Sequence, residues 1–195
     1  MTIMKSLTEL PMGYRQIFSV NLQKDKKIAM VINIGAIIIG IIMAVPMHFY
    51  ISITSLFDFS QGMGNYLARF IVLMVSMIAY IILHEAVHGV AMKICGTKKI
   101  KYGFTGLYAF AGSDDFYDKG SYIFIALAPV VLWGIVLAVI NCFVPESWFW
   151  VVYFIQIANI SGAAGDIYVT AKFSKMPNDI LVKDIGVGMT VYSAE

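Results

Sequence analysis

Charged residues are scarce in this 195-residue chain: they make up 13% of it, whereas hydrophobic residues make up 59%. Soluble globular domains carry about 25% charged residues. The mean hydropathy of +0.79 is also far above that of a soluble protein. A soluble core cannot account for this balance, which indicates an integral membrane protein whose first partner is the lipid bilayer.

Cysteine is nearly absent as well, because the chain has only two, Cys95 and Cys142. The two are expected at opposite ends of the membrane-spanning region, too far apart for a disulfide bond. A disulfide framework and a cysteine metal cluster are therefore not expected. The sequence also lacks a glycine-rich phosphate-binding motif and a serine or cysteine nucleophile grouped with a histidine.

Four apolar stretches are long enough to cross a bilayer, which needs about 20 residues. They cover residues 28–51, 66–94, 121–144 and 148–171. The first is too long for the core of a signal peptide and lacks a convincing cleavage site, so it is expected to remain as a span. The sequence predicts an all-α integral membrane protein in which residues 1–195 form one membrane-embedded domain.

Basic residues fall almost entirely on one side of the expected spans. Of the 14 lysine and arginine residues, only Arg69 lies near the other side. Because positively charged segments stay in the cytoplasm, both termini are predicted to be cytoplasmic. This asymmetry also accounts for the net charge of +2, so nucleic acid is not expected as a partner.

Histidine is rare, and two of the three histidines stand in the sequence His84-Glu85-Ala86-Val87-His88 near the end of the second stretch. On a helix, residues four apart lie on one face. His84 and His88 can therefore present ring nitrogens to one ion while Glu85 reaches a bound water. This is the signature of zinc hydrolases. The alternative is a pair of core histidines that hydrogen-bond to their neighbours.

A catalytic zinc ion needs a third protein ligand. No histidine follows His88, and the two later glutamates lie in a short turn and at the chain end. Among the later aspartates, Asp166 alone lies inside an apolar stretch. His84 and Asp166 are each 18 residues from the outer ends of their stretches, or ~27 Å deep. The matching depth predicts Asp166 as the third ligand, and a helix cap or snorkelling anion is the alternative.

The loop of residues 95–120 alternates aromatic and small residues, which predicts a short β-hairpin on the cytoplasmic side. Beside a metal site, the edge of such a hairpin could bind an extended peptide by strand addition. Structural cover for the helix ends is the simpler role. The tail, residues 176–192, is expected to fold back on this loop.

The histidine motif occurs together with Ala128-Pro129 in the third stretch and with the segment from Asn159 to Asp166 in the fourth. In these features the chain resembles the zincin peptidase family of small integral-membrane bacterial proteins. The resemblance implies a bacterial cell membrane as the location. More distantly, it is similar to the site-2 family of intramembrane metalloproteases. It departs from the site-2 pattern because the asparagine-to-aspartate spacing is one residue shorter, a proline is missing and no glycine follows Asp166.

The resemblance implies a zinc ion held by His84, His88 and Asp166, with Glu85 as the general base. For Asn159 it implies that the amide orients the substrate or polarises its carbonyl. An interhelical hydrogen bond is the alternative role for Asn159.

The leading hypothesis is a zinc-dependent, membrane-embedded endopeptidase that acts on a membrane-associated polypeptide. The alternative is a non-catalytic metal-binding membrane sensor or adaptor, or an inactive peptidase relative. The presence of Glu85 favours the enzyme over the non-catalytic protein, because metal ligation alone does not need that carboxylate. A transporter has little support, because the four stretches show no internal repeat.

Overall fold

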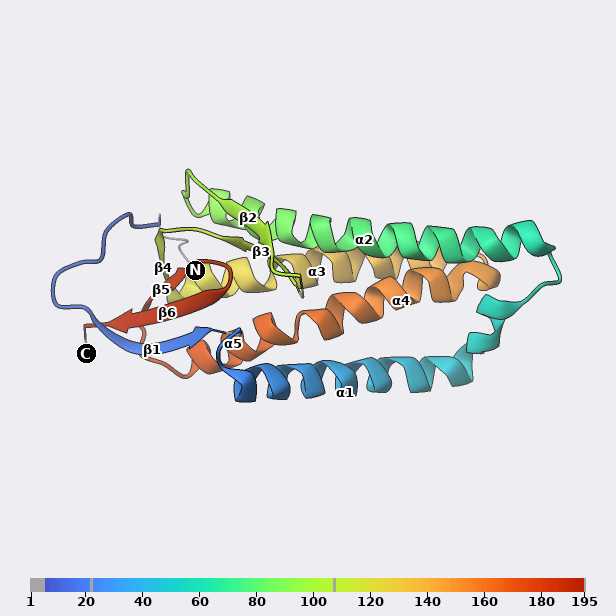
Figure 1. The fold of residues 1–195 in the computed structure, drawn as a ribbon, viewed down its shortest axis with the longest axis horizontal. Helices are drawn as coiled ribbons and strands as arrows, with labels where there is room; N and C mark the ends of the chain where they lie inside the picture. The colour runs from blue at the N-terminus through green and yellow to red at the C-terminus, as the bar shows by residue number, and fades with distance from the viewer. Residues whose placement is uncertain (1–5, 22, 107, 195) are drawn as a thin grey trace. The chain divides into compact units, whose positions relative to one another are not determined.

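The computed structural model describes residues 6–21, 23–106 and 108–194. The chain forms two compact units. Unit 1 contains Met1–Ile32, His84–Pro129 and Gly165–Glu195, and unit 2 contains Asn33–Leu83 and Val130–Ala164. Three long helices contribute residues to both units, and they are α1 (Lys26–Tyr50), α2 (Met63–Ile94) and α3 (Lys119–Phe143) (Figure 1). A short 3-10 helix, η1 (Ile53–Phe57), lies between α1 and α2.

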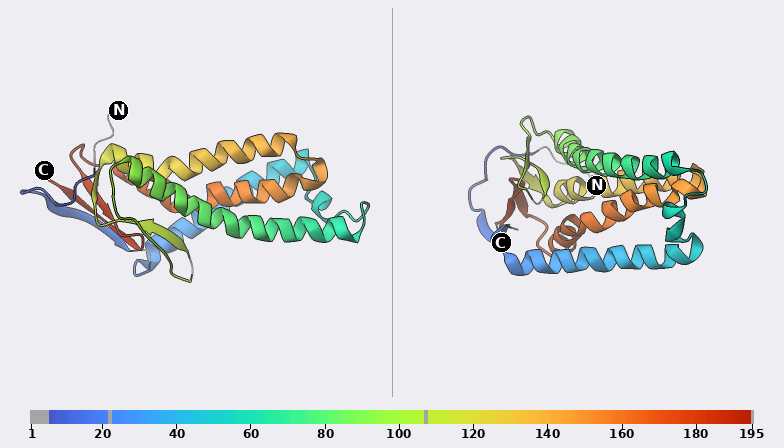
Figure 2. Two further views of the ribbon diagram at one scale, coloured as in Figure 1. Left: turned by 90° about the horizontal axis from the view of Figure 1, so that it is seen from above. Right: turned by 45° about the vertical axis from the view of Figure 1, so that its right-hand side comes forward.

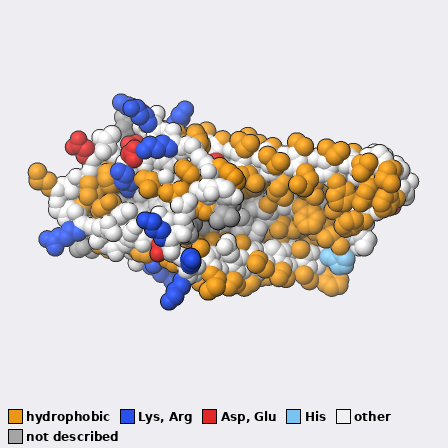
Figure 3. Space-filling view, in the orientation of Figure 1, with side chains coloured by type: hydrophobic (Ala, Val, Ile, Leu, Met, Phe, Trp, Pro, Cys, Tyr) orange, Lys and Arg blue, Asp and Glu red, His pale blue; other side chains and the backbone are white. Residues whose placement is uncertain are grey.

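The three long helices are each long and apolar enough to cross a membrane. Their bounds confirm, within three residues, the stretches predicted at 28–51, 66–94 and 121–144. The chain therefore has the helices of a membrane protein. In α1 no residue is buried, as expected for a helix that faces lipid. Hydrophobic side chains cover the helices in Figure 3, whereas lysine and arginine side chains gather over the strands.

The prediction of a continuous fourth span at 148–171 needs correction. This stretch forms two helices, α4 (Glu146–Gly162) with 17 residues and α5 (Ala164–Ser174) with 11 residues. The break falls at Ala163, in a run of small residues that includes Gly162 and Gly165. Glycine is a poor helix former, so this run is a weak point in a long helix. The break leaves Asp166 in the first turn of α5.

The prediction of an all-α fold holds in part: the described chain is mostly helical, but unit 1 also contains a four-stranded antiparallel sheet with the order β1-β6-β5-β4. Its strands are β1 (Arg15–Asn21), β4 (Phe116–Asp118), β5 (Leu181–Asp184) and β6 (Gly188–Ser193). β1 and β6 come from opposite ends of the chain, with Arg15 opposite Ser193, and lie side by side (Figure 2). The prediction that the tail folds back on the loop is confirmed, because β5 pairs with β4.

The core of unit 1 joins this sheet to the helix ends that carry the candidate site. Its buried side chains come from the last turns of α2, the first half of α3, α5 and strands β4, β5 and β6. They are Ala91, Met92, Cys95, Tyr117, Tyr122, Ile125, Ala126, Val169, Phe173, Ile180, Val182 and Val191. Packing of this kind fixes the helix ends of unit 1 in one arrangement.

The predicted hairpin in the loop is confirmed by β2 (Lys101–Phe104) and β3 (Ala109–Gly112), which pair in antiparallel register. The hairpin touches the turn between β5 and β6. A Cβ atom on Gly112 would lie 2.5 Å from both the Gly186 nitrogen and the Ile185 carbonyl carbon. Glycine at position 112 therefore allows the hairpin and the tail to meet backbone to backbone.

We expect Gly112→Ala to lower the free energy of unfolding by about 1–3 kcal/mol, because its methyl group meets backbone atoms that cannot move aside. Chemical denaturation in detergent measures the change. Gly64→Ala is the matched control: Gly64 lies in α2, and a Cβ there meets nothing within 4 Å. Equal stability of the two variants would contradict the close contact at Gly112.

Candidate metal centre

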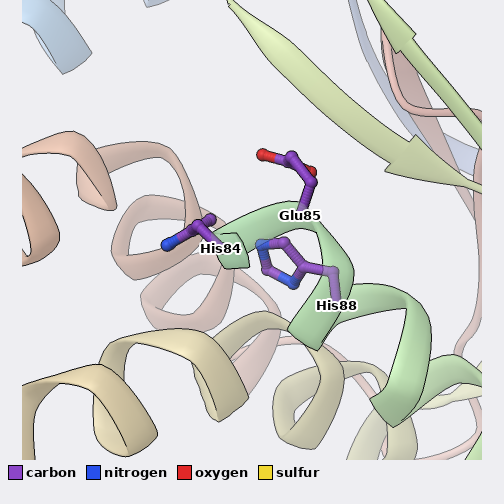
Figure 4. Close-up of side chains that lie close together, drawn as sticks. All are labelled: His84, Glu85 and His88. Atoms are coloured by element: carbon purple, nitrogen blue, oxygen red, sulfur yellow. The ribbon is translucent and has the colours of Figure 1, made fainter. Parts of the chain in front are cut away.

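His84, Glu85 and His88 lie in the last third of α2, within unit 1 (Figure 4). Each offers one ligand atom, and the three atoms lie within 4.8 Å of one another. Both histidines are largely buried, each with 9% of its surface exposed. The helical repeat therefore places both imidazoles and the carboxylate as the motif predicts.

Asp166 joins the two histidines from α5. Its Oδ2 atom lies 3.7 Å from His84 Nε2 and 3.7 Å from His88 Nε2. These separations are too long for hydrogen bonds. The Asp166 side chain is 25% exposed, so water can reach the group. Unit 1 therefore brings together the three residues predicted as metal ligands.

The donor set fits zinc. Zinc binds histidine nitrogen and carboxylate oxygen at about 2.0–2.2 Å, which puts neighbouring ligand atoms about 3.4 to 3.6 Å apart in tetrahedral or slightly wider geometry. The 3.7 Å separations are close to this spacing. Two imidazoles and one carboxylate, with a position left for water, also match the ligands of catalytic zinc sites.

The second nitrogen of His88 has a partner of its own. His88 Nδ1 lies 2.9 Å from the backbone oxygen of Ile125 in α3. A carbonyl oxygen only accepts hydrogen bonds, so Nδ1 must carry the proton and donate it. Nε2 is then left without a proton and faces Asp166. Metal-binding histidines commonly have a partner of this kind.

The hairpin lies against the Glu85 side of α2. The backbone N–H of Ala111 in β3 faces the Glu85 carboxylate and interacts with its charge. Gly89 is one turn further along the same helix face, and a Cβ there would lie 1.8 Å from the hydroxyl oxygen of Tyr102. Tyr102 and Ala111 are opposite each other in the hairpin. The two contacts therefore fix the hairpin over Glu85.

Sequence reasoning missed a tyrosine–aspartate pair beside the candidate ligands. The buried Tyr122 of α3 donates a hydrogen bond from its hydroxyl to Asp184 Oδ2 at 2.6 Å. Burial raises the pKa of the Asp184 carboxyl, although the hydrogen bonds from Tyr122 and from the Gly186 N–H lower it. Asp184 is near enough for its charge to interact with His88 and Asp166. The tail position of Asp184 gave no local sign of this proximity.

Asn159 belongs to unit 2 and is fully buried in α4. Its Oδ1 accepts a hydrogen bond from the Tyr80 hydroxyl at 3.0 Å, and its Nδ2 donates to the Val130 carbonyl at 3.1 Å. These partners lie in α2 and α3, so the amide makes the interhelical hydrogen bonds expected as its simpler role. The prediction that it orients a substrate stays a prediction.

The His84-Glu85-Ala86-Val87-His88 sequence on a helix, with a carboxylate close to both histidines, is typical of zincins. Comparison with known families agrees. The sequence model of the family described as "Putative zincin peptidase" matches residues 77–181, just over half of the chain, and the protein belongs to this family. The matched range contains all three candidate ligands and Glu85.

A curated relative is also similar to this chain. The "Uncharacterized 24.7 kDa protein in gap 5'region" of Pyrococcus woesei is 31% identical over 122 residues. The aligned part covers 60% of this chain and 53% of that protein, so the match spans about half the relative's length. No solved structure matches the chain.

For metal binding, we expect detergent-purified protein to hold about one zinc ion per chain, as measured by elemental mass spectrometry. The zinc content of His84→Ala and of Asp166→Ala should fall to background, because each substitution removes a ligand. The matched control is His48→Ala. His48 accepts a hydrogen bond from the Ile53 N–H in unit 2, so its loss should leave zinc unchanged. Full zinc content in Asp166→Ala would remove Asp166 from the ligand set.

For Asn159, we expect a double-mutant cycle of Tyr80→Phe and Asn159→Ala to give a coupling energy of about 0.6 kcal/mol, the average for hydrogen bonds between membrane helices. Unfolding in detergent provides the four stabilities. A coupling energy of zero would show that this hydrogen bond does not stabilise unit 2.

Proposed function

We propose that this protein is a zinc-dependent, membrane-embedded endopeptidase that hydrolyses a peptide bond of a membrane-associated polypeptide. The observation that carries the proposal is the position of Asp166 Oδ2, 3.7 Å from the Nε2 atoms of both motif histidines. A converging carboxylate next to an HExxH pair is the donor set of a zinc hydrolase. Membership of a zincin peptidase family supports the same activity.

His84, His88 and Asp166 would hold the zinc ion. When bound, zinc lowers the pKa of a water molecule toward neutrality and polarises the substrate carbonyl. The three residues leave room for that water, because a catalytic zinc site uses three protein ligands and one open position. The partial exposure of Asp166 supports access for water from outside the core.

Glu85 would carry the proton. Its carboxylate is within 4.8 Å of the ligand nitrogens, so one of its oxygens can reach a water at the open position. We propose that it accepts a proton from the attacking water and passes it to the leaving nitrogen of the cleaved amide. The Ala111 N–H holds the carboxylate in place from the hairpin side.

The contacts of the hairpin support its role as cover. Tyr102 packs on Gly89, and the Ala111 N–H faces Glu85, so the hairpin would shield this face of α2 from bulk water. Exclusion of water strengthens electrostatic interactions inside a catalytic site. Binding of an extended peptide to the edge of the hairpin stays a prediction.

The substrate class follows from the helix that carries the motif. α2 is long and apolar enough to cross a membrane, and the motif lies within it. A site in such a helix is near the bilayer, and a polypeptide held in or on the membrane reaches it most easily. Asn159 hydrogen-bonds within unit 2 through both ends of its amide, and its role in orienting a substrate stays a prediction.

We expect Glu85→Gln to keep its zinc and to lower peptide cleavage by about 10²–10⁴-fold, because an amide cannot accept the proton. Mass spectrometry of labelled N-termini, in membranes from cells producing wild type or variant, would detect the cleaved polypeptides. Glu146→Gln is the matched control, since Glu146 lies exposed in the first turn of α4 in unit 2. The Glu146→Gln variant should cleave the same polypeptides to the same extent as wild type.

The same experiment separates the two candidate functions. New N-termini that appear with wild type and vanish with Glu85→Gln support the endopeptidase. Zinc-loaded wild type that yields no new N-termini would favour the metal-binding sensor or inactive relative. Cleavage that continues in Glu85→Gln would contradict the proposed role of this carboxylate.

A further inference from the structure

Pro129 lies inside α3 and is fully buried. In an α-helix each backbone N–H bonds to the carbonyl four residues earlier. Proline has no N–H, so the helix leaves the carbonyl of Ile125 without its usual partner. Ile125 itself is 2% exposed, which leaves little surface for water to take that place.

His88 takes the position of the missing donor. Its Nδ1 lies 2.9 Å from the Ile125 oxygen, and both residues belong to unit 1. The proton is thereby fixed on Nδ1, and the lone pair of Nε2 faces the point shared with Asp166. Neutral imidazole binds a metal only through a nitrogen that carries no proton.

We propose that Pro129 is a positioning residue for the metal centre: by leaving the Ile125 carbonyl open, it sets the tautomer and the ring orientation of His88. This inference rests on the proposed zinc site. An alanine at position 129 would supply an N–H that can bond to the Ile125 carbonyl, and it would straighten α3 at this turn, since proline bends helices. The carbonyl would then bond within the helix in place of His88.

α1 offers a natural comparison. Pro46 also lies inside a helix and leaves a carbonyl open, that of Ile42. Ile42 is 64% exposed, so its surroundings differ from the buried setting of Ile125. Pro46 and Ile42 belong to unit 2, whereas the candidate ligands belong to unit 1. Pro46 is thus a proline inside a helix that does not belong to the unit with the candidate ligands.

The first experiment measures zinc affinity by competition with a chelator, using the full-length protein in detergent. Pro129→Ala should bind zinc about 10–100-fold more weakly than wild type, the range for loss of a partner that orients a metal-binding histidine. Pro46→Ala should bind like wild type. Lactic acid at position 129, introduced by nonsense suppression, has the shape of alanine but no N–H, and it should restore most of the affinity.

Each outcome decides one point. Wild type that binds no zinc refutes the proposed metal site itself. Wild type that binds zinc, with Pro129→Ala of equal affinity, overturns the role of Pro129 alone. If the alanine and lactic acid proteins bind zinc equally weakly, the effect comes from the lost proline ring. If Pro46→Ala binds zinc as weakly as Pro129→Ala, the effect comes from helix straightening in general. Both results overturn the inference.

A measurement on the wild type covers the case in which Pro129→Ala does not fold. Nitrogen-15 NMR of metal-free protein labelled at histidine reports the tautomer of each ring, and the chain has three histidines to assign. We expect the neutral form of the His88 ring, reached by raising the pH, to carry its proton on Nδ1. A neutral His88 ring with its proton on Nε2 would overturn the inference without any variant.

Discussion

The structure depends on the convergence of two largely buried imidazoles and one carboxylate in unit 1. Moving polar and ionised groups out of water costs free energy, unless other charges and hydrogen bonds compensate them. His84, His88 and Asp166 face a common point with separations of 3.7 Å, too long for hydrogen bonds between them. A divalent cation at that point would compensate all three groups, which is why the arrangement favours a metal centre over a pair of core histidines.

The surrounding helices and strands orient the side chains of the candidate site. α3 supplies a backbone carbonyl to His88, and β3 supplies an N–H to Glu85. The four-stranded sheet and its core hold the ends of α2, α3 and α5 in the positions that these contacts require. Tyr122 and Asp184 place a further hydrogen-bonded carboxylate nearby. The groups that orient the motif therefore come from regions that are far from it in the sequence.

Unit 2 shows a different use of polar groups in an apolar setting. Asn159 joins three helices through Tyr80 and Val130, and the buried Arg69 donates hydrogen bonds to the backbone carbonyls of Ser55, Asp58 and Ser147. Each of these contacts links helices or the turns between them. In this unit, buried polar side chains act as connectors of apolar helices, in keeping with their role in membrane proteins.

The sequence by itself determined the three long helices, the HExxH face and the choice of Asp166. Long apolar runs and the four-residue helical repeat are local patterns, and a carboxylate inside an apolar run stands out because its charge is costly to bury without a partner. Only the tertiary structure decided the four-stranded sheet, the break at Ala163 and the partners of His88 and Glu85. Strands of three to seven residues, paired between the two ends of the chain, leave almost no local pattern. A hydrogen bond to a backbone group leaves no pattern in the sequence, because every residue except proline carries the same backbone N–H and C=O.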